Sequence, residues 1–323
     1  MKTKTVQQLE YSRPLDVHKW SDYPEVNGFV NQIWDEYLAS EFIEPEGPGK
    51  RAKSPSKKQF KVLLLDLYVA LKEDPELLIG LSLGKRFFKP NSRYNALHIS
   101  FKISDVVHYL KKVGLIGMKL GVKLGLSTRI WPTEKLQRLF QQSNFSPLLF
   151  RSHEDKEVIV LNDTELQPNG RLSDSGKPQE YSDEDYAEIP RMRKMLLRYN
   201  DLLRRSFIDL QNHEEPVYRR RFWNPKKRAW DEKAIVTGHH NKFVRRVFYR
   251  GSWQLGGRFH GGFWQQIDGD KREQIRINDF RTVELDFSGL HINIAYALEG
   301  LGPIEGDPYE VEPLFNVPAS EQR

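Results

Sequence analysis

The most informative absence in this chain of 323 residues is cysteine, of which it has none. That absence excludes disulfides, cysteine-ligated zinc, iron–sulfur clusters and thiol nucleophiles together. It also favours a reducing compartment, and we expect a cytoplasmic protein. The apolar stretches near 62–71 and 290–298 are far shorter than the roughly 20 residues of a membrane span. The first eight residues have no apolar core of the kind a signal peptide needs, so we expect no membrane association.

Acidic and basic residues are present in quantity but are unevenly placed. Hydrophobic residues make up 38% of the chain and aromatic residues 12%, which is enough for a substantial core. The formal net charge is +6, which favours a polyanionic partner. Residues 154–188 contain eleven Asp and Glu against three Lys and Arg, whereas 191–250 contain seventeen Lys and Arg against six Asp and Glu. The basic character therefore belongs to one region.

Apolar spacing, caps and chain breakers predict five elements between residues 57 and 142: helices at 60–72, 101–113 and 133–140, and short strands at 115–120 and 126–131. Ser100 is a suitable N-cap for the second helix, and Gly114 suits its C-terminus. This order resembles the winged helix-turn-helix family. The resemblance implies that the helix at 101–113 enters the major groove while the wing contacts phosphate.

The candidate groove-facing residues are Lys102, Ser104, Asp105, His108, Lys111 and Lys112, and the candidate wing residues are Lys119, Lys123 and Arg129. Winged helices also serve as protein–protein modules, and in that alternative these charges form an ordinary solvated face.

A second basic stretch lies at 217–230, where arginine and lysine alternate with aromatic residues. Guanidinium groups neutralise phosphates, and aromatic rings stack on unpaired bases. The alternative is that these aromatic residues only fill a core. The candidate nucleic-acid contacts are Arg219, Arg220, Arg221, Lys226, Lys227 and Arg228.

The segment 249–300 holds the residues that point to chemistry. Residues 283–287 alternate as a strand, and an apolar helix is predicted over 290–298. Asp286, near the strand end, is placed either to hold a divalent cation or to cap the helix. The amides of Ser288 and Gly289 at the helix N-terminus favour phosphate oxygens.

The run Asp286-Phe-Ser-Gly-Leu-His-Ile-Asn-Ile-Ala resembles motif A of family A DNA polymerases and the matching stretch of single-subunit phage-type RNA polymerases. Gly257-Arg258-Phe259 resembles an element upstream of motif A in those RNA polymerases. The combination also resembles plasmid- and prophage-borne proteins with an N-terminal winged helix.

The resemblance implies a two-metal nucleotidyl-transfer site that uses Mg²⁺. In it, Asp286 is a catalytic metal ligand, with Glu284 as a second candidate, and Arg258 is a catalytic phosphate-binding group. Ser288, Gly289 and His291 bind the incoming nucleoside triphosphate. His291 stands where family A polymerases carry Glu, which leaves the choice of deoxyribonucleotide or ribonucleotide open. Motifs B and C follow motif A in these polymerases, and no stretch after Asp286 resembles either of them, so we expect a polymerase-like palm cut off inside its fold and leave enzymatic activity open.

We therefore expect an α/β protein of the α+β kind, with a winged helix-turn-helix and a mixed C-terminal domain. Its expected parts are an N-terminal extension (1–56), a winged-helix domain (57–150), an acidic linker (151–190) and a basic, palm-like C-terminal domain (191–323).

The leading hypothesis is a DNA-binding, replication-type protein of a mobile element, with RNA as another partner and the oligomeric state open. The second is a non-enzymatic winged-helix regulator or plasmid maintenance protein. The third is a metal-dependent nuclease using Glu284, Asp286 and His291, because the two carboxylates share a strand face.

Overall fold

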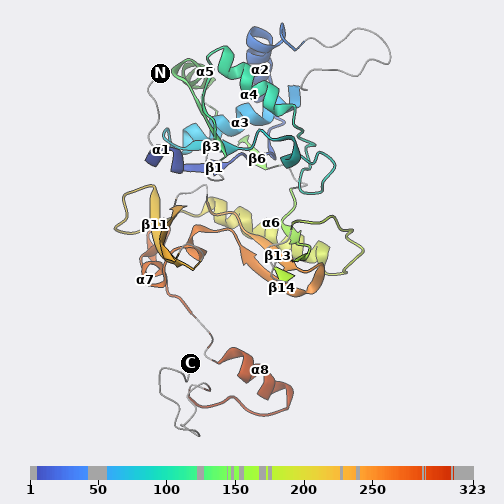
Figure 1. Cartoon of the computed structure of the whole chain (residues 1–323), viewed down its shortest axis with the longest axis vertical. Helices are drawn as coiled ribbons and strands as arrows, with labels where there is room; N and C mark the ends of the chain where they lie inside the picture. The colour runs from blue at the N-terminus through green and yellow to red at the C-terminus, as the bar shows by residue number, and fades with distance from the viewer. Residues whose placement is uncertain are drawn as a thin grey trace. The chain divides into compact units, whose positions relative to one another are not determined.

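The computed structural model describes residues 6–42, 57–121, 127–143, 145–146, 149–152, 156–166, 172–173, 177–225, 228–237, 241–285, 287, 289–306 and 308. The chain is an α+β protein with several small sheets (Figure 1). It divides into two compact units, Met1–Phe280 and Arg281–Arg323.

The first part of the larger unit contains α1 (Val6–Glu10), β1 (Ser12–Pro14), β2 (Lys19–Trp20), α2 (Pro24–Ile33), η1 (Trp34–Leu38), α3 (Lys57–Glu73), β3 (Leu78–Leu81), η2 (Lys85–Phe87), α4 (Ile103–Lys112), β4 (Ile116–Lys119), β5 (Thr128–Pro132) and α5 (Glu134–Ser143). The strands form a sheet in the order β1-β3-β5-β4, in which β5 is antiparallel to both β3 and β4. β1 joins the edge of this sheet parallel to β3. The helices predicted at 60–72, 101–113 and 133–140 are confirmed as α3, α4 and α5.

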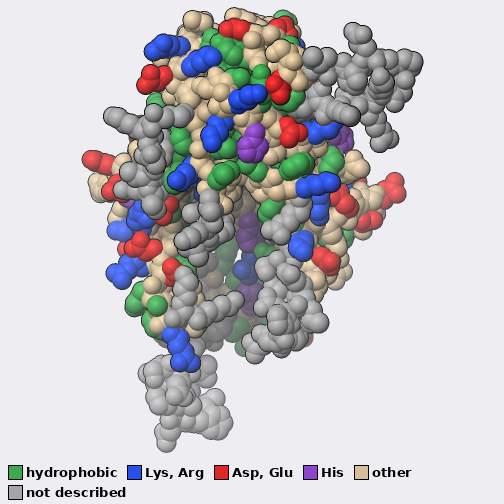
Figure 2. Space-filling view, turned by 45° about the horizontal axis from the view of Figure 1, so that its top comes forward, with side chains coloured by type: hydrophobic (Ala, Val, Ile, Leu, Met, Phe, Trp, Pro, Cys, Tyr) green, Lys and Arg blue, Asp and Glu red, His purple; other side chains and the backbone are tan. Residues whose placement is uncertain are grey.

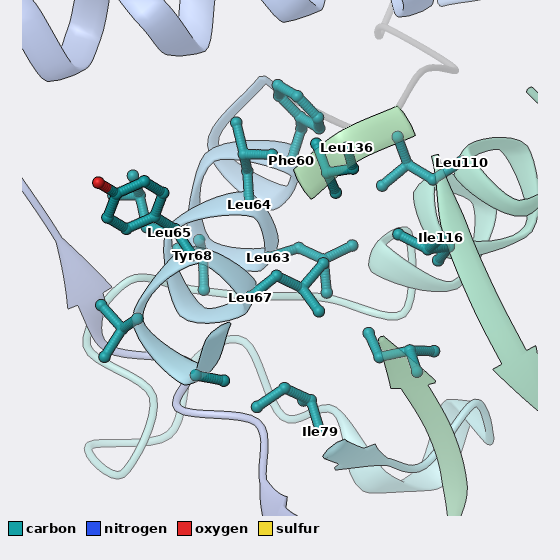
Figure 3. Close-up of a cluster of buried hydrophobic side chains, with 14 of the residues drawn as sticks. Phe60, Leu63, Leu64, Leu65, Leu67, Tyr68, Ile79, Leu110, Ile116 and Leu136 are labelled. Atoms are coloured by element: carbon teal, nitrogen blue, oxygen red, sulfur yellow. The ribbon is translucent and has the colours of Figure 1, made fainter. Parts of the chain in front are cut away.

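α3 is the centre of the first hydrophobic cluster, because residues 59–70 are buried on every side. Figure 3 shows its side chains meeting Ile79 of β3, Leu110 of α4 and Leu136 of α5. A helix that is buried all round needs neighbours on all its faces, and here they come from both the sheet and the flanking helices.

α4 ends at a glycine, as its sequence predicts. Gly114 has φ +77°, and its amide donates to the carbonyl of Lys111 while Leu115 donates to Leu110. This paired pattern is a Schellman cap, which satisfies carbonyls at the helix end and turns the chain into β4. The prediction of Ser100 as the N-cap is wrong: the N-cap position is Lys102, whose amide donates to Ser100 Oγ at 3.4 Å.

The rest of the larger unit contains β6 (Arg151–Ser152), β7 (Ile159–Leu161), β8 (Glu165–Leu166), β9 (Leu172–Ser173), α6 (Ile189–Arg205), β10 (Ile208–Leu210), β11 (Val217–Asn224), β12 (Ala229–Val236), β13 (Arg245–Tyr249), β14 (Ser252–His260), η4 (Phe263–Gln265), α7 (Gly269–Arg272), β15 (Ile275–Ile277) and β16 (Phe280–Arg281). A second hydrophobic cluster draws on residues 158–275. In it, α6 buries Met192, Leu196 and Leu203 beside the sheet β14-β13-β7 (Figure 1).

Part of the segment expected as an acidic linker is built into this second cluster. Val158 and Ile159 are fully buried, and β7 pairs in parallel with β13. The neighbouring Glu157 is also buried, and it accepts hydrogen bonds from Arg93 at 3.0 Å and Arg193 at 2.9 Å. The two guanidinium groups offset the cost of burying this carboxylate. Counting charges along the chain does not reveal such a pairing.

The smaller unit contains α8 (Leu290–Leu298), which confirms the predicted apolar helix. Gly289 precedes it with φ +58°. The strand expected at 283–287 is not formed at residues 282–285, which have neither helix nor strand structure. An alternating pattern becomes a strand only where a neighbouring strand takes up its backbone hydrogen bonds, and no described strand pairs with these residues.

Candidate nucleic-acid interface

The exposed face of α4 carries part of the predicted groove-facing set. His108, Lys111 and Lys112 are exposed, and Lys102 is half-buried at the helix start. Ser104, which the sequence analysis placed on this face, is instead buried beside the first cluster. Ser104 is buried together with Ile103, Val106 and Val107. The buried face of α4 is therefore wider than its apolar residues alone indicate.

Arg129, predicted on the wing, has a structural role in the described chain. Its guanidinium donates from Nε to the carbonyl of Leu9 and from Nη1 to the carbonyl and Oγ of Ser127. Burial lowers the pKa of this guanidinium. Lys119 is exposed at the end of β4, and Lys123 lies outside the described residues.

The β11–β12 hairpin is anchored at its base by both hydrophobic clusters. Val217 belongs to the first cluster, and Val236 packs against it from the opposite strand. Ile235 belongs to the second cluster, and Tyr218 packs against that one. Because successive strand residues point to opposite faces, the two faces of the hairpin base are held by two different cores.

Two hairpin residues that were predicted to contact phosphate form ion pairs within the protein. Arg219 meets Glu10 at 2.6 Å, and Arg220 Nε meets Asp268 Oδ1 at 2.8 Å. Asp268 also accepts a hydrogen bond from the hydroxyl group of Tyr218. These two arginines therefore fix the hairpin to α1 and to the start of α7, and they are less suited to bind an external phosphate.

The half of the hairpin nearest its turn does not pack on either core, and it carries aromatic side chains. Trp223 and Trp230 face each other across the strands, with ring centroids 5.9 Å apart and planes inclined by 76°. They are 52% and 63% exposed. Arg221 lies on the same face, with Cζ 5.9 Å from the Trp230 ring centroid, and no ion pair joins it to a described side chain. Arg228 is exposed at the turn, while Lys226 and Lys227 lie outside the described residues.

The proposed metal site is only partly described. Asp286 and Ser288 lie outside the described residues. Glu284 and His291 are exposed, and Gly289 is buried. Within the described ranges no group of three His, Asp or Glu side chains is arranged to hold a metal ion. The Mg²⁺ site at Asp286 therefore stays a prediction.

Arg258 and its neighbouring glycines lie in β14, where Arg258 is exposed and pairs across the sheet with Val247. A contact next to Arg258 that the sequence does not predict is a 2.9 Å hydrogen bond between Tyr249 Oη and His260 Nε2. These two residues are eleven positions apart. Only the pairing of β13 with β14 brings them to one face.

Figure 2 shows Lys and Arg side chains interspersed with Asp and Glu side chains over the described surface on this face of the molecule. None of the described helices is long and apolar enough to cross a membrane. No family model, curated protein or solved structure matches this chain.

Proposed function

We propose that this chain binds nucleic acid, with the end of the β11–β12 hairpin contacting unpaired bases and α4 lying against duplex DNA. The observation that carries the proposal is the exposure of Trp223 and Trp230 beside Arg221 on a hairpin whose base is already anchored. Rings exposed by half or more contribute little to a core. Stacking on bases uses this kind of exposed ring, and an adjacent guanidinium adds phosphate attraction.

The arrangement around α4 supports the duplex half of the proposal. α3 precedes β3, α4 lies between β3 and β4, and the sheet order β3-β5-β4 places the last strand in the middle. This order of elements is compatible with the proposed winged helix, although the segment between β3 and α4 contains the short η2 in place of a full helix. The exposed His108, Lys111 and Lys112 then face the nucleic acid.

The proposal extends to a replication-type protein of a mobile element through the resemblance of the Asp286 segment to polymerase motif A. In that extension, Asp286 holds Mg²⁺ and the amides after it hold a triphosphate. The regulator hypothesis needs only the binding surfaces, so the two differ in their dependence on Asp286 and Mg²⁺.

The test is fluorescence anisotropy with labelled single-stranded, duplex and forked DNA in a salt series. Trp223→Ala and Trp230→Ala should each weaken binding to single-stranded and forked DNA by about 5- to 150-fold, since stacking contributes about 1–3 kcal/mol per base. Duplex affinity should change little. Phe87→Ala is the matched control, because Phe87 is an aromatic residue of similar exposure, 59%, away from the hairpin.

Lys111→Gln tests the duplex surface separately. Losing one phosphate contact should reduce the slope of log affinity against log salt by about 1. Tryptophan variants that bind all three DNAs as the wild type does would refute the hairpin's role. A primer–template preference that depends on Mg²⁺ and is lost in Asp286→Ala would support the replication-type extension, and its absence would favour the regulator.

A further inference from the structure

The exposed face of the β13–β14 hairpin brings together a hydroxyl, an imidazole and a guanidinium. Tyr249 and His260 are hydrogen-bonded at 2.9 Å, and their rings meet edge to face with centroids 6.2 Å apart. Arg258 is two residues from His260, and its cross-strand partner Val247 is two residues from Tyr249. By the alternation of a strand, Arg258 shares a face with both. It is exposed, and no described side chain forms an ion pair with it.

Two consecutive glycines lie beside this contact, and the first of them makes room for the tyrosine ring. Gly256 and Gly257 have φ +87° and +73°, and the pairing of the strands shifts register at this point. A Cβ at Gly256 would lie 2.4 Å from Cδ2 of Tyr249, so only glycine leaves room for the tyrosine ring. Bulges of this kind re-aim side chains and are frequent beside active sites.

We propose that Tyr249 is a nucleophile that cleaves a DNA strand by transesterification and remains covalently joined to it. The inference rests on the proposed nucleic-acid binding and adds a reaction to it. Its substrate is a phosphodiester of single-stranded or locally unpaired DNA. The Tyr249 hydroxyl paired with a base within hydrogen-bond distance is the arrangement by which hydroxyl nucleophiles are activated.

The step balances without a cofactor or an oxidant. His260 Nε2 accepts the proton of Tyr249 Oη as that oxygen attacks phosphorus. The bond from phosphorus to one bridging oxygen of the strand breaks, and the leaving oxygen takes a proton from His260. One phosphodiester is exchanged for another, so the reverse reaction rejoins the strand. Arg258 pairs with the non-bridging oxygens, where charge accumulates in the transition state.

The experiment is a covalent-capture assay on the full chain. The wild-type protein is incubated with a random-sequence single-stranded DNA pool labelled at the 5′ end, and with a second pool labelled at the 3′ end. The mixture is then denatured in detergent. We expect label to migrate with the protein in one of the two pools, and mass spectrometry to place the phosphate on Tyr249. Binding of both pools is measured by anisotropy in parallel.

Tyr249→Phe keeps the ring over Gly256 and should abolish the adduct while leaving DNA binding intact. His260→Gln should slow adduct formation by about 10²- to 10⁴-fold, the usual contribution of a general base. Tyr199→Phe is the control, since Tyr199 is a 40% exposed tyrosine that stacks on Phe259, on the face of β14 opposite to His260, and it should give wild-type yield.

Wild-type protein that binds the pools but forms no adduct overturns this inference and leaves the proposed function standing. An adduct that persists in Tyr249→Phe also overturns it. Wild-type protein that binds none of the pools would refute the proposed nucleic-acid binding itself. Failure of the proposed function is thus distinguishable from failure of the covalent reaction.

Discussion

Asp66 is a small buried side chain whose removal should greatly lower the free energy of unfolding of this protein. It lies in the middle of α3, within the stretch 59–70 that is buried on every side, and its side chain is 0% exposed. Arg13 of β1 pairs with both of its oxygens at 2.8 Å, and the amide of Asp16 donates to it at 3.0 Å. Burial alone would lower the pKa of the Arg13 guanidinium, but the carboxylates of Asp66, Glu73 and Asp16 together outweigh burial and raise this pKa.

We expect Asp66→Ala to lower the free energy of unfolding by about 3–5 kcal/mol. The variant removes the closest carboxylate from a guanidinium that is only 11% exposed, while the carboxylate of Glu73 stays 3.7 Å from Arg13 Nε. Breaking a buried pair from one side carries a penalty of that order. The intact ion pair contributes less than about 3–5 kcal/mol to the free energy of unfolding, because both charged groups lose their hydration on folding. The double variant Arg13→Met with Asp66→Leu should therefore recover most of the loss.

Urea unfolding followed by tryptophan fluorescence measures these differences. Asp201→Ala is the control, because Asp201 pairs with Arg204 on the exposed surface of α6, and such pairs contribute within about 1 kcal/mol. A loss below about 1 kcal/mol in Asp66→Ala would refute the reasoning. A double variant as unstable as the single one would refute the account of an unpaired buried charge.

Three further outcomes follow from the described contacts. Hydrogen bonds from Arg193, and more weakly from Arg93, lower the pKa of Asp183 from 3.8 to about 2, so its contribution to stability is complete above about pH 4 and is lost as the pH falls through about 2. Unfolding midpoints measured across that range should fall less steeply in Arg193→Gln, and an unchanged profile would contradict the assignment. Gly256→Ala should cost about 1–3 kcal/mol in urea unfolding, because it combines a positive φ with a clash, and it should also abolish the covalent adduct. Phe140→Ala should cost about 3–5 kcal/mol, since Phe140 is fully buried with its ring 5.0 Å from that of Tyr68, and a loss under about 1 kcal/mol would show that the site collapses around the gap.

The sequence by itself determined most of the helices and the location of the basic surfaces. α3, α4, α5 and α8 lie where apolar spacing predicts them, and Gly114 ends α4 as expected. Helical periodicity and caps depend on residues within a few positions of one another, so they can be read along the chain. The excess of arginine in 191–250 likewise needs no structure to be seen.

Only the tertiary structure decided what each charged or aromatic side chain is available to do. Arg219 and Arg220 stand beside Arg221 in the sequence, yet the first two are held by Glu10 and Asp268. Whether Trp223 and Trp230 fill a core or face solvent depended on how far the two clusters reach up the hairpin.

The same holds for contacts between distant positions. Strand pairing and a glycine bulge unite Tyr249 with His260, while Glu157 meets Arg93 and Arg193 from 64 and 36 positions away. Such contacts depend on which segments pair and in which register. These are properties of the whole fold, and a local pattern cannot specify them.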